Sequence, residues 1–213
     1  MIQLPLLLAH LVSILFVSPD VPPVASVEVI EAPAETLESI YADCGLAGAL
    51  EVSVFSAAMQ KLDEHDLDAS VIAVADMTQP STAKRFYLID VKARRLIKRT
   101  YVAHGQNSGE LNATSFSNVD GSHQTSLGLY RVGEEIVSPK HGAALLLYGL
   151  DEGSNCQALK REIIMHGADY VSEEFIKRQG RLGRSWGCPA VSRADMPEMI
   201  KLLAGTGVLY IHG

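Results

Sequence analysis

After about residue 70, the apolar residues occur in short runs bounded by polar residues, a spacing typical of β-strands. Seven such runs cover residues 71–75, 86–91, 96–103, 127–132, 144–148, 162–166 and 208–212. Between residues 35 and 65 the apolar side chains instead recur at helical spacing with a break at residues 45–48, which predicts two helices. Pro197 and Gly205 bracket a further short helix over residues 196–204, because proline suits a first helical turn and glycine a C-terminal cap. We therefore expect a mainly-β domain with short N-terminal helices and a C-terminal helix.

Glycine is concentrated in the middle of the chain. Eight glycines fall within about fifty residues: Gly105, Gly109, Gly121, Gly128, Gly133, Gly142, Gly149 and Gly153. So many glycines indicate loops with positive φ or close backbone approach. Because binding and catalytic groups concentrate on loops carried by a rigid scaffold, we expect these loops to border the functional site.

The N-terminus has the pattern of an export signal. Residues 4–17 are almost entirely apolar, about the length of a signal-peptide core and short for a bilayer span, and Val24-Ala25-Ser26 offers a cleavage site. We interpret residues 1–26 as a signal peptide, 27–35 as a linker in a proline-rich stretch, and 36–213 as one catalytic domain. The protein is then exported to the periplasm or cell envelope. An uncleaved anchor or a buried helix remains the alternative for the first segment.

Composition limits the partners. Apolar residues make up 47% of the 213 residues and the net charge is -7, so the chain can form a full core and lacks the basic face that nucleic acid requires. Three cysteines, Cys44, Cys156 and Cys188, leave at least one unpaired in an oxidising compartment, and a bridge between the first two stays open. We expect a monomer.

Cys188 is the candidate nucleophile. Gly187 precedes it and Pro189 follows, so the backbone turns sharply and exposes the sulfur. The amides of Trp186, Gly187 and Cys188 have no evident ladder partner in such a turn and can stabilise an oxyanion. The hydroxyl of Ser185 can fix the turn.

His166 is the candidate base. It ends the apolar run 163–165 and precedes Gly167, which places it at a strand end. A thiol with an ordinary pKa of about 8.5 is mostly protonated at neutral pH and needs a base beside it. A strand-end histidine and a turn cysteine, separated by a helix-like segment over residues 172–177, can meet across one loop for nucleophilic catalysis. A buried structural cysteine near a surface histidine is the alternative.

A His-Gly followed by a spacer and Ser-X-Gly-Cys resembles the L,D-transpeptidase (YkuD-like) catalytic domain, and more closely its murein L,D-transpeptidase catalytic domain branch. The phrases that carry this resemblance are residues 102–105 (VAHG), 107–109 (NSG), 116–118 (FSN), 126–128 (SLG), 140–142 (KHG), 148–150 (YGL), 166–168 (HGA) and 183–191 (GRSWGCPAV). It extends from about residue 37 to the C-terminus.

The resemblance implies a β-sandwich catalytic domain with Cys188 as acyl acceptor, His166 as base and no cofactor. It implies peptidoglycan stem peptides as partners: Cys188 attacks a stem tetrapeptide, D-alanine leaves, and an amine resolves the thioester into a 3–3 cross-link. In the family a backbone carbonyl, not an acidic side chain, usually orients the histidine. Further candidates for the substrate cleft are His104, Ser126, Gly167 and Arg184.

Two departures concern substrate contacts. The commonest family pattern has histidine where Trp186 stands and arginine or asparagine where Ala190 stands, and the spacer between His166 and Ser185 is slightly long. Trp186 either shields the thioester or packs in the turn.

Other functions stay open. Water as acceptor would make the enzyme an L,D-carboxypeptidase, and a catalytically silent wall-binding module remains possible. An envelope cysteine peptidase or amidase normally places its cysteine before its histidine, unlike this chain. The histidines at 104, 123 and 141 could join His166 and Cys188 in a zinc site, but no metal-ligand spacing occurs, so we expect no metal.

Overall fold

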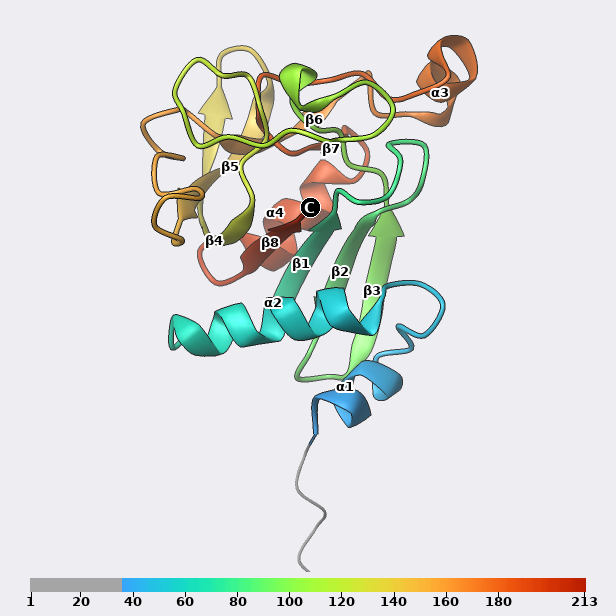
Figure 1. Ribbon diagram of the computed structural model, residues 1–213, viewed down its shortest axis with the longest axis vertical. Coiled ribbons are helices and arrows are strands. Elements are labelled where there is room, and N and C mark those ends of the chain that lie inside the picture. Colours follow the sequence, from blue (N-terminus) through green and yellow to red (C-terminus); the bar gives the residue numbers. More distant parts are fainter. Residues whose placement is uncertain (1–35) are drawn as a thin grey trace, which may run out of the picture. The chain divides into compact units, whose positions relative to one another are not determined.

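The computed structural model describes residues 36–213, and the signal-peptide and linker segments that we expect over residues 1–35 lie outside the described residues. Four α-helices and eight strands follow one another along this part of the chain (Figure 1). The helices are α1 (Leu37–Asp43), α2 (Val52–Glu64), α3 (Glu173–Gln179) and α4 (Met196–Leu203). The strands are β1 (Val71–Asp76), β2 (Phe86–Asp90), β3 (Arg95–Thr100), β4 (Gly128–Ser138), β5 (Gly142–Gly149), β6 (Ile164–Ala168), β7 (Ala190–Ser192) and β8 (Val208–His212).

This architecture confirms the mainly-β class, the two N-terminal helices and the helix near the C-terminus. All seven expected strands are present, and β7 is an eighth that the sequence patterns did not indicate. In α4, Pro197 occupies the first turn and Gly205, at φ +73°, follows the end of the helix as expected. None of the helices over residues 36–213 is long and apolar enough to cross a membrane.

The eight strands form one sheet in the order β3-β2-β1-β8-β4-β5-β6-β7. β8 lies parallel to β1 and antiparallel to β4, so it joins the two halves of the sheet. β6 and β7 are also parallel, with His166 opposite Ala190. This last pairing matters for function because it brings the segment that follows Cys188 alongside the strand that carries His166.

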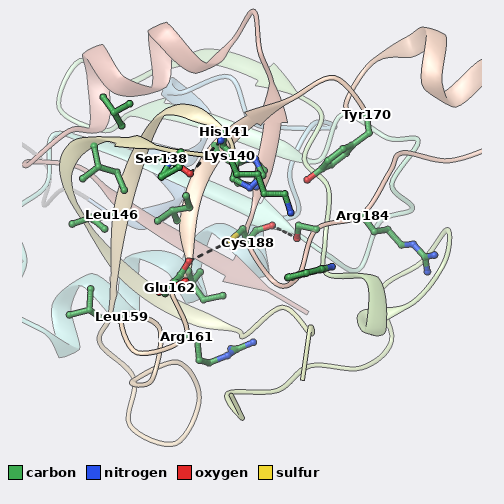
Figure 2. A pocket seen from close by; sticks show the side chains of 18 residues that line it. Ser138, Lys140, His141, Leu146, Leu159, Arg161, Glu162, Tyr170, Arg184 and Cys188 are labelled. Atoms are coloured by element: carbon green, nitrogen blue, oxygen red, sulfur yellow. Dashed lines mark hydrogen bonds between the residues drawn. The ribbon is translucent and has the colours of Figure 1, made fainter. Parts of the chain in front are cut away.

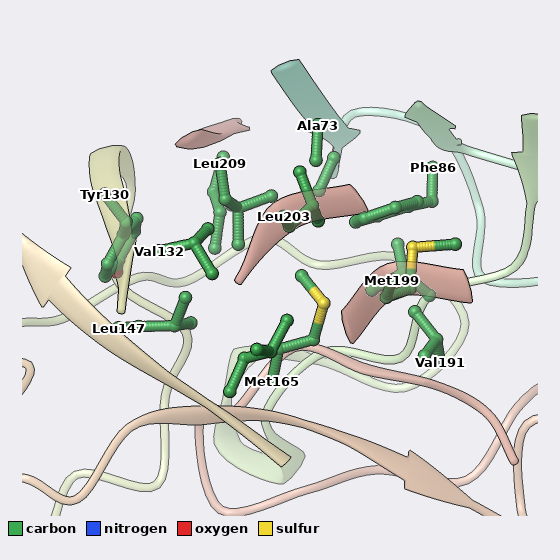
Figure 3. Close-up of a cluster of buried hydrophobic side chains, with 14 of the residues drawn as sticks. Ala73, Phe86, Tyr130, Val132, Leu147, Met165, Val191, Met199, Leu203 and Leu209 are labelled. Carbon is green, nitrogen blue, oxygen red and sulfur yellow. The ribbon is translucent and has the colours of Figure 1, made fainter. Parts of the chain in front are cut away.

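The two faces of the first half-sheet are covered differently. On one face α2 packs through Val54, Phe55, Ala58 and Leu62, which recur at helical spacing and are buried against β1 and β2 (Figure 1). The other face contributes to a second buried cluster, in which side chains of both half-sheets surround α4 (Figure 3). Met199 and Leu203 of α4 lie within this cluster, between Phe86 of β2 and Met165 of β6. The two halves of one continuous sheet therefore both contribute side chains to the core that contains α4.

Candidate active site

Cys188 and His166 line the same cavity, whose volume is about 710 Å³ (Figure 2). Three segments enclose it: the β4–β5 hairpin, the chain that enters β6, and residues 184–188. Much of the wall is apolar, formed by Ile136, Val137, Leu146, Leu159, Ile163 and Ile164. The cavity is thus an apolar cleft with a few polar groups, which is the usual form of a small-molecule or peptide site.

Residues 185–189, which we call the Cys188 turn, are locked by one hydroxyl. Ser185 Oγ donates to the carbonyl oxygen of Cys188 at 2.6 Å and accepts from the Gly187 amide at 3.1 Å. Gly187 has φ +121°, and a Cβ there would lie 2.8 Å from the carbonyl oxygen of Gln124, so only glycine fits. Because its amide is already bonded to Ser185, Gly187 does not offer the free oxyanion donor that we expected from the sequence. Within residues 36–213 the amides of Trp186 and Cys188 donate to no backbone carbonyl.

His166 differs in position from the sequence-based expectation. It is the middle residue of β6, only 1% exposed, and not a strand-end residue with little around it. Its Nδ1 lies 3.2 Å from the carbonyl oxygen of Gly167. Because a carbonyl can only accept, Nδ1 carries the hydrogen and Nε2 keeps its lone pair. A backbone carbonyl therefore sets the tautomer that a general base requires.

A second histidine covers the ring of His166. His141, from the turn of the β4–β5 hairpin, stacks on it with ring centroids 3.7 Å apart and planes 23° from parallel. Burial lowers the pKa of His166, the Gly167 hydrogen bond opposes this effect, and neighbouring His141, Arg193 and Lys140 add to it, so that the resulting pKa is about 4. His166 is consequently neutral at physiological pH. The sequence placed His141 in a loop and did not pair it with His166.

The thiol of Cys188 is half-buried, and its hydrogen-bond contact is with the carbonyl oxygen of Glu162, 3.8 Å from Sγ. Among the described residues Sγ makes no hydrogen bond to His166. Burial raises the pKa of the Cys188 thiol, whereas the Ile164 amide, Arg161 and Lys140 act to lower it. The resting pair is therefore a thiol and a neutral imidazole.

Trp186 is 62% exposed and lies at the edge of the cavity. Its indole stacks on His123, with centroids 4.8 Å apart and planes 8° from parallel. The ammonium of Lys140 lies over the indole, 4.6 Å from the ring centroid. Trp186 thereby connects the hairpin tip to the loop that carries His123, a contact between separate loops and not packing within its own turn.

Of the four further cleft candidates, one lines the cavity and three do not. Arg184 lines the cavity, where its Nη1 bonds Glu110 at 2.7 Å. His104, Ser126 and Gly167 are buried and are not among the residues that line this cavity. The ring of His104 is fully buried. Both of its ring nitrogens have hydrogen-bond partners, Arg85 at Nδ1 and the carbonyl of Gly109 at Nε2.

Ser126 and Gly167 do not line the cavity but form hydrogen bonds to residues that do, Arg161 and His166. Ser126 bonds Tyr130 and Arg161, and Gly167 bonds the ring of His166 through its carbonyl. Arg161 lines the cavity beside Cys188, although no sequence pattern singled it out.

All three thiols are free, with Cys44 buried and Cys156 exposed. Within the described part of the chain no three potential metal ligands of the His, Cys, Asp and Glu types gather.

The fold and this cavity define a mainly-β protein with a cysteine and a neutral histidine in one cleft. The chain belongs to the L,D-transpeptidase catalytic domain family, whose model matches residues 47–212. The resemblance inferred from the sequence motifs is thereby confirmed. A comparison with curated proteins finds no match.

Solved structures similar to this chain include L,D-transpeptidases from two organisms and a protein of Bdellovibrio bacteriovorus. One from Mycobacterium smegmatis is 13% identical, with a TM-score of 0.41 over 68% of this chain and 59% of that one. One from Stackebrandtia nassauensis is 13% identical, with a TM-score of 0.40 over 83% and 76%. Bdellovibrio bacteriovorus Bd1075 is 16% identical, with a TM-score of 0.41 over 67% and 48%. The match therefore spans 59% of the length of the first of these proteins.

Proposed function

We propose that this chain is an exported peptidoglycan L,D-transpeptidase that uses Cys188 as nucleophile and His166 as general base. The observation that carries the proposal is the cavity shared by Cys188 and His166, with the histidine tautomer set by the Gly167 carbonyl. Family membership supports the transpeptidase reaction. The proposed donor is a stem tetrapeptide, and the proposed product is a 3–3 cross-link.

The charge of the cavity favours a peptide that carries carboxylates. Its lining includes Lys140, Arg161 and Arg184 but a single acidic residue, Glu162. This excess of cations stands out because the whole chain has a net charge of -7. A local positive field in a partly apolar cleft attracts anionic ligands, which fits the terminal carboxylate of a stem peptide.

The proposed reaction has two halves. Nε2 of His166 takes the thiol proton as Sγ of Cys188 attacks the carbonyl carbon, and the negative charge moves to the carbonyl oxygen, towards which the Cys188 and Trp186 amides can donate. The C–N bond breaks, and D-alanine leaves as an amine after taking the proton from His166. An incoming amine then attacks the thioester and transfers its proton to His166. The C–S bond breaks, and the released thiolate takes the proton from His166 to restore the thiol.

Mass spectrometry of the protein with purified tetrapeptide muropeptides tests this proposal. We expect loss of D-alanine, a thioester adduct on Cys188 and a dimer joined through two diamino acids. Cys188→Ala should give none of these with an unchanged circular dichroism spectrum, whereas the matched variant Cys156→Ala should retain all of them. Tripeptide without dimer would replace the transpeptidase with the L,D-carboxypeptidase. No turnover and no adduct would refute the enzyme and favour a silent wall-binding module.

Export is tested separately. N-terminal sequencing of the protein recovered from the cell envelope is expected to begin after Ser26, because Val24-Ala25-Ser26 ends in small residues that signal peptidases accept. Recovery from the envelope with Met1 retained would replace the cleaved signal with an anchor. Recovery in the cytoplasm alone would refute the proposed location.

A further inference from the structure

Arg161 connects two segments that meet below the cavity. It lies in the chain between β5 and β6, and its guanidinium reaches residues 117–126. Nη1 donates to the Ser117 carbonyl at 2.9 Å and to Ser126 Oγ at 3.0 Å. Nη2 donates to Ser122 Oγ at 3.2 Å and to the Gln124 carbonyl at 2.7 Å. All four Nη hydrogens are therefore used within the protein, so they are not free to bind a substrate carboxylate.

The same guanidinium touches the Cys188 turn. A Cβ built on Gly187 would lie 3.2 Å from Nη2 of Arg161, so the cation packs against the residue that precedes the nucleophile. Arg161 is half-buried, and Figure 2 shows it on the cavity wall below Cys188. The thiol and the guanidinium consequently share one desolvated region, where charges interact more strongly than in water.

Arg161 has no carboxylate within ion-pair distance among residues 36–213, and Asp120 acts on its charge only from farther away. Its four acceptors are two carbonyls and two hydroxyls, and it forms no ion pair with any carboxylate of residues 36–213. Arg184, the other arginine of the cavity, is different because Glu110 lies 2.7 Å from its Nη1. Of the two arginines, only Arg161 has no paired carboxylate among residues 36–213 to offset its field at the thiol.

We propose that Arg161 is the positioning residue that stabilises the thiolate of Cys188, while its four hydrogen bonds hold residues 117–126 against the Cys188 turn. The proposal rests on the proposed function in taking Cys188 as the nucleophile. It assigns a role to a residue outside both the His-Gly and the Ser-X-Gly-Cys motifs. Ala190 stands where the commonest family pattern has arginine or asparagine, is fully buried in β7 and carries no charge. Arg161 supplies a cation from a different position in the chain.

The other charged or titratable groups around the thiol do not replace Arg161. They are His166 on β6, His141 and Lys140 on the hairpin, Tyr130 on β4, Tyr170 after β6, Glu162, and Arg184, which is paired with Glu110. Burial raises the pKa of both tyrosines and lowers that of both histidines, so all four are neutral at pH 7. Lys140 is exposed to solvent, where its charge is screened. Arg161 precedes Lys140 among the causes that lower the pKa of Cys188.

The pH dependence of Cys188 alkylation by iodoacetamide tests the proposal, since only the thiolate reacts. The measurements use Cys156→Ser protein, in which the remaining thiol besides Cys188 is the buried Cys44. Arg161→Gln is expected to slow alkylation at pH 7 by about tenfold, with an unchanged plateau at high pH, because losing a nearby cation raises a pKa by about one unit. Arg161→Lys should stay within about threefold of the parent. Arg178→Gln, at an exposed arginine of α3 that does not line the cavity, is the control and should match the parent at every pH.

Several outcomes would overturn the proposal. An Arg161→Gln profile identical to that of the parent removes the charge effect. Equal losses at pH 7 and on the plateau, in both Arg161→Gln and Arg161→Lys, reduce Arg161 to a loop support. If Arg161→Gln fails to fold, Ser122→Asp decides instead, because a carboxylate on Nη2 neutralises the arginine without removing it and should also slow alkylation at pH 7. Alkylation requires no turnover, so loss of muropeptide activity with these profiles intact would refute only the proposed function.

Discussion

Acid should destabilise this fold through His104, a buried histidine outside the cavity. Nη2 of Arg85 lies 2.7 Å from Nδ1 of His104 and must donate to it, while Nε2 faces the Gly109 carbonyl at 3.2 Å. Protonation of Nδ1 would set two N–H groups against each other in a fully buried site. Burial first, and then the charge of Arg85, lowers the pKa of His104 from its ordinary 6.5 to about 4.

The sign of the pH effect follows from this depressed pKa. Between pH 6.5 and 4 the unfolded chain binds a proton at His104 that the folded chain does not, so the free energy of unfolding falls as the pH falls. A pKa difference between 6.5 and about 4 corresponds to about 2 kcal/mol at pH 5. Above pH 7 the histidine is neutral in both states and contributes nothing to the pH dependence.

Urea unfolding followed by circular dichroism at pH 7 and pH 5 measures this contribution. His104→Gln removes the ionisation, and its lost hydrogen bonds weaken the protein equally at both pH values. The loss of stability between pH 7 and pH 5 should therefore be about 2 kcal/mol smaller in His104→Gln than in the parent. Equal losses in the two proteins would refute the reasoning, since His104 would then ionise as freely in the folded chain as in the unfolded one.

Three further predictions concern the cavity. His166→Ala should slow acylation of Cys188 by about 10² or more, the usual effect of losing a general base, and single-turnover mass spectrometry measures it; an unchanged rate would move the base to His141. Gly187→Ala should lower acylation at least tenfold, because its φ of +121° and the Gln124 carbonyl 2.8 Å from the new Cβ would displace the Cys188 turn; normal activity would show that the turn tolerates a side chain. EDTA should leave turnover unchanged, and zinc-restored activity after EDTA would contradict the metal-free assignment.

Local patterns predicted most of the fold. The apolar runs succeeded because strands that face a core need consecutive or alternating apolar residues. α2 and α4 follow helical spacing, and Pro197 and Gly205 mark the ends of α4. β7 was missed because its three residues, Ala190–Ser192, are too few to establish a period. The strand order was also inaccessible, since pairing between β1 and β8 depends on contacts that no local pattern records.

The candidate site was predictable where chemistry and chain position coincide. Cys188 and Ser185 belong to one turn, so their relation is local. His141 and Arg161 were not predicted because folding alone brings them to His166 and Cys188. The burial of His104 could not be read from its glycine-rich surroundings, which resemble those of an exposed loop.

The position of β8 imposes an order on assembly. β1 pairs with β8 from Ile72 opposite Val208 to Asp76 opposite His212, so strands far apart in the chain become neighbours. On the ribosome, residues 208–212 emerge after every other strand, and until then each half-sheet exposes an unpaired edge. Contacts between such distant segments slow folding because their loop-closure entropy must be overcome first. The sheet consequently cannot join its two halves until residues 208–212 are available to pair with β1 and β4.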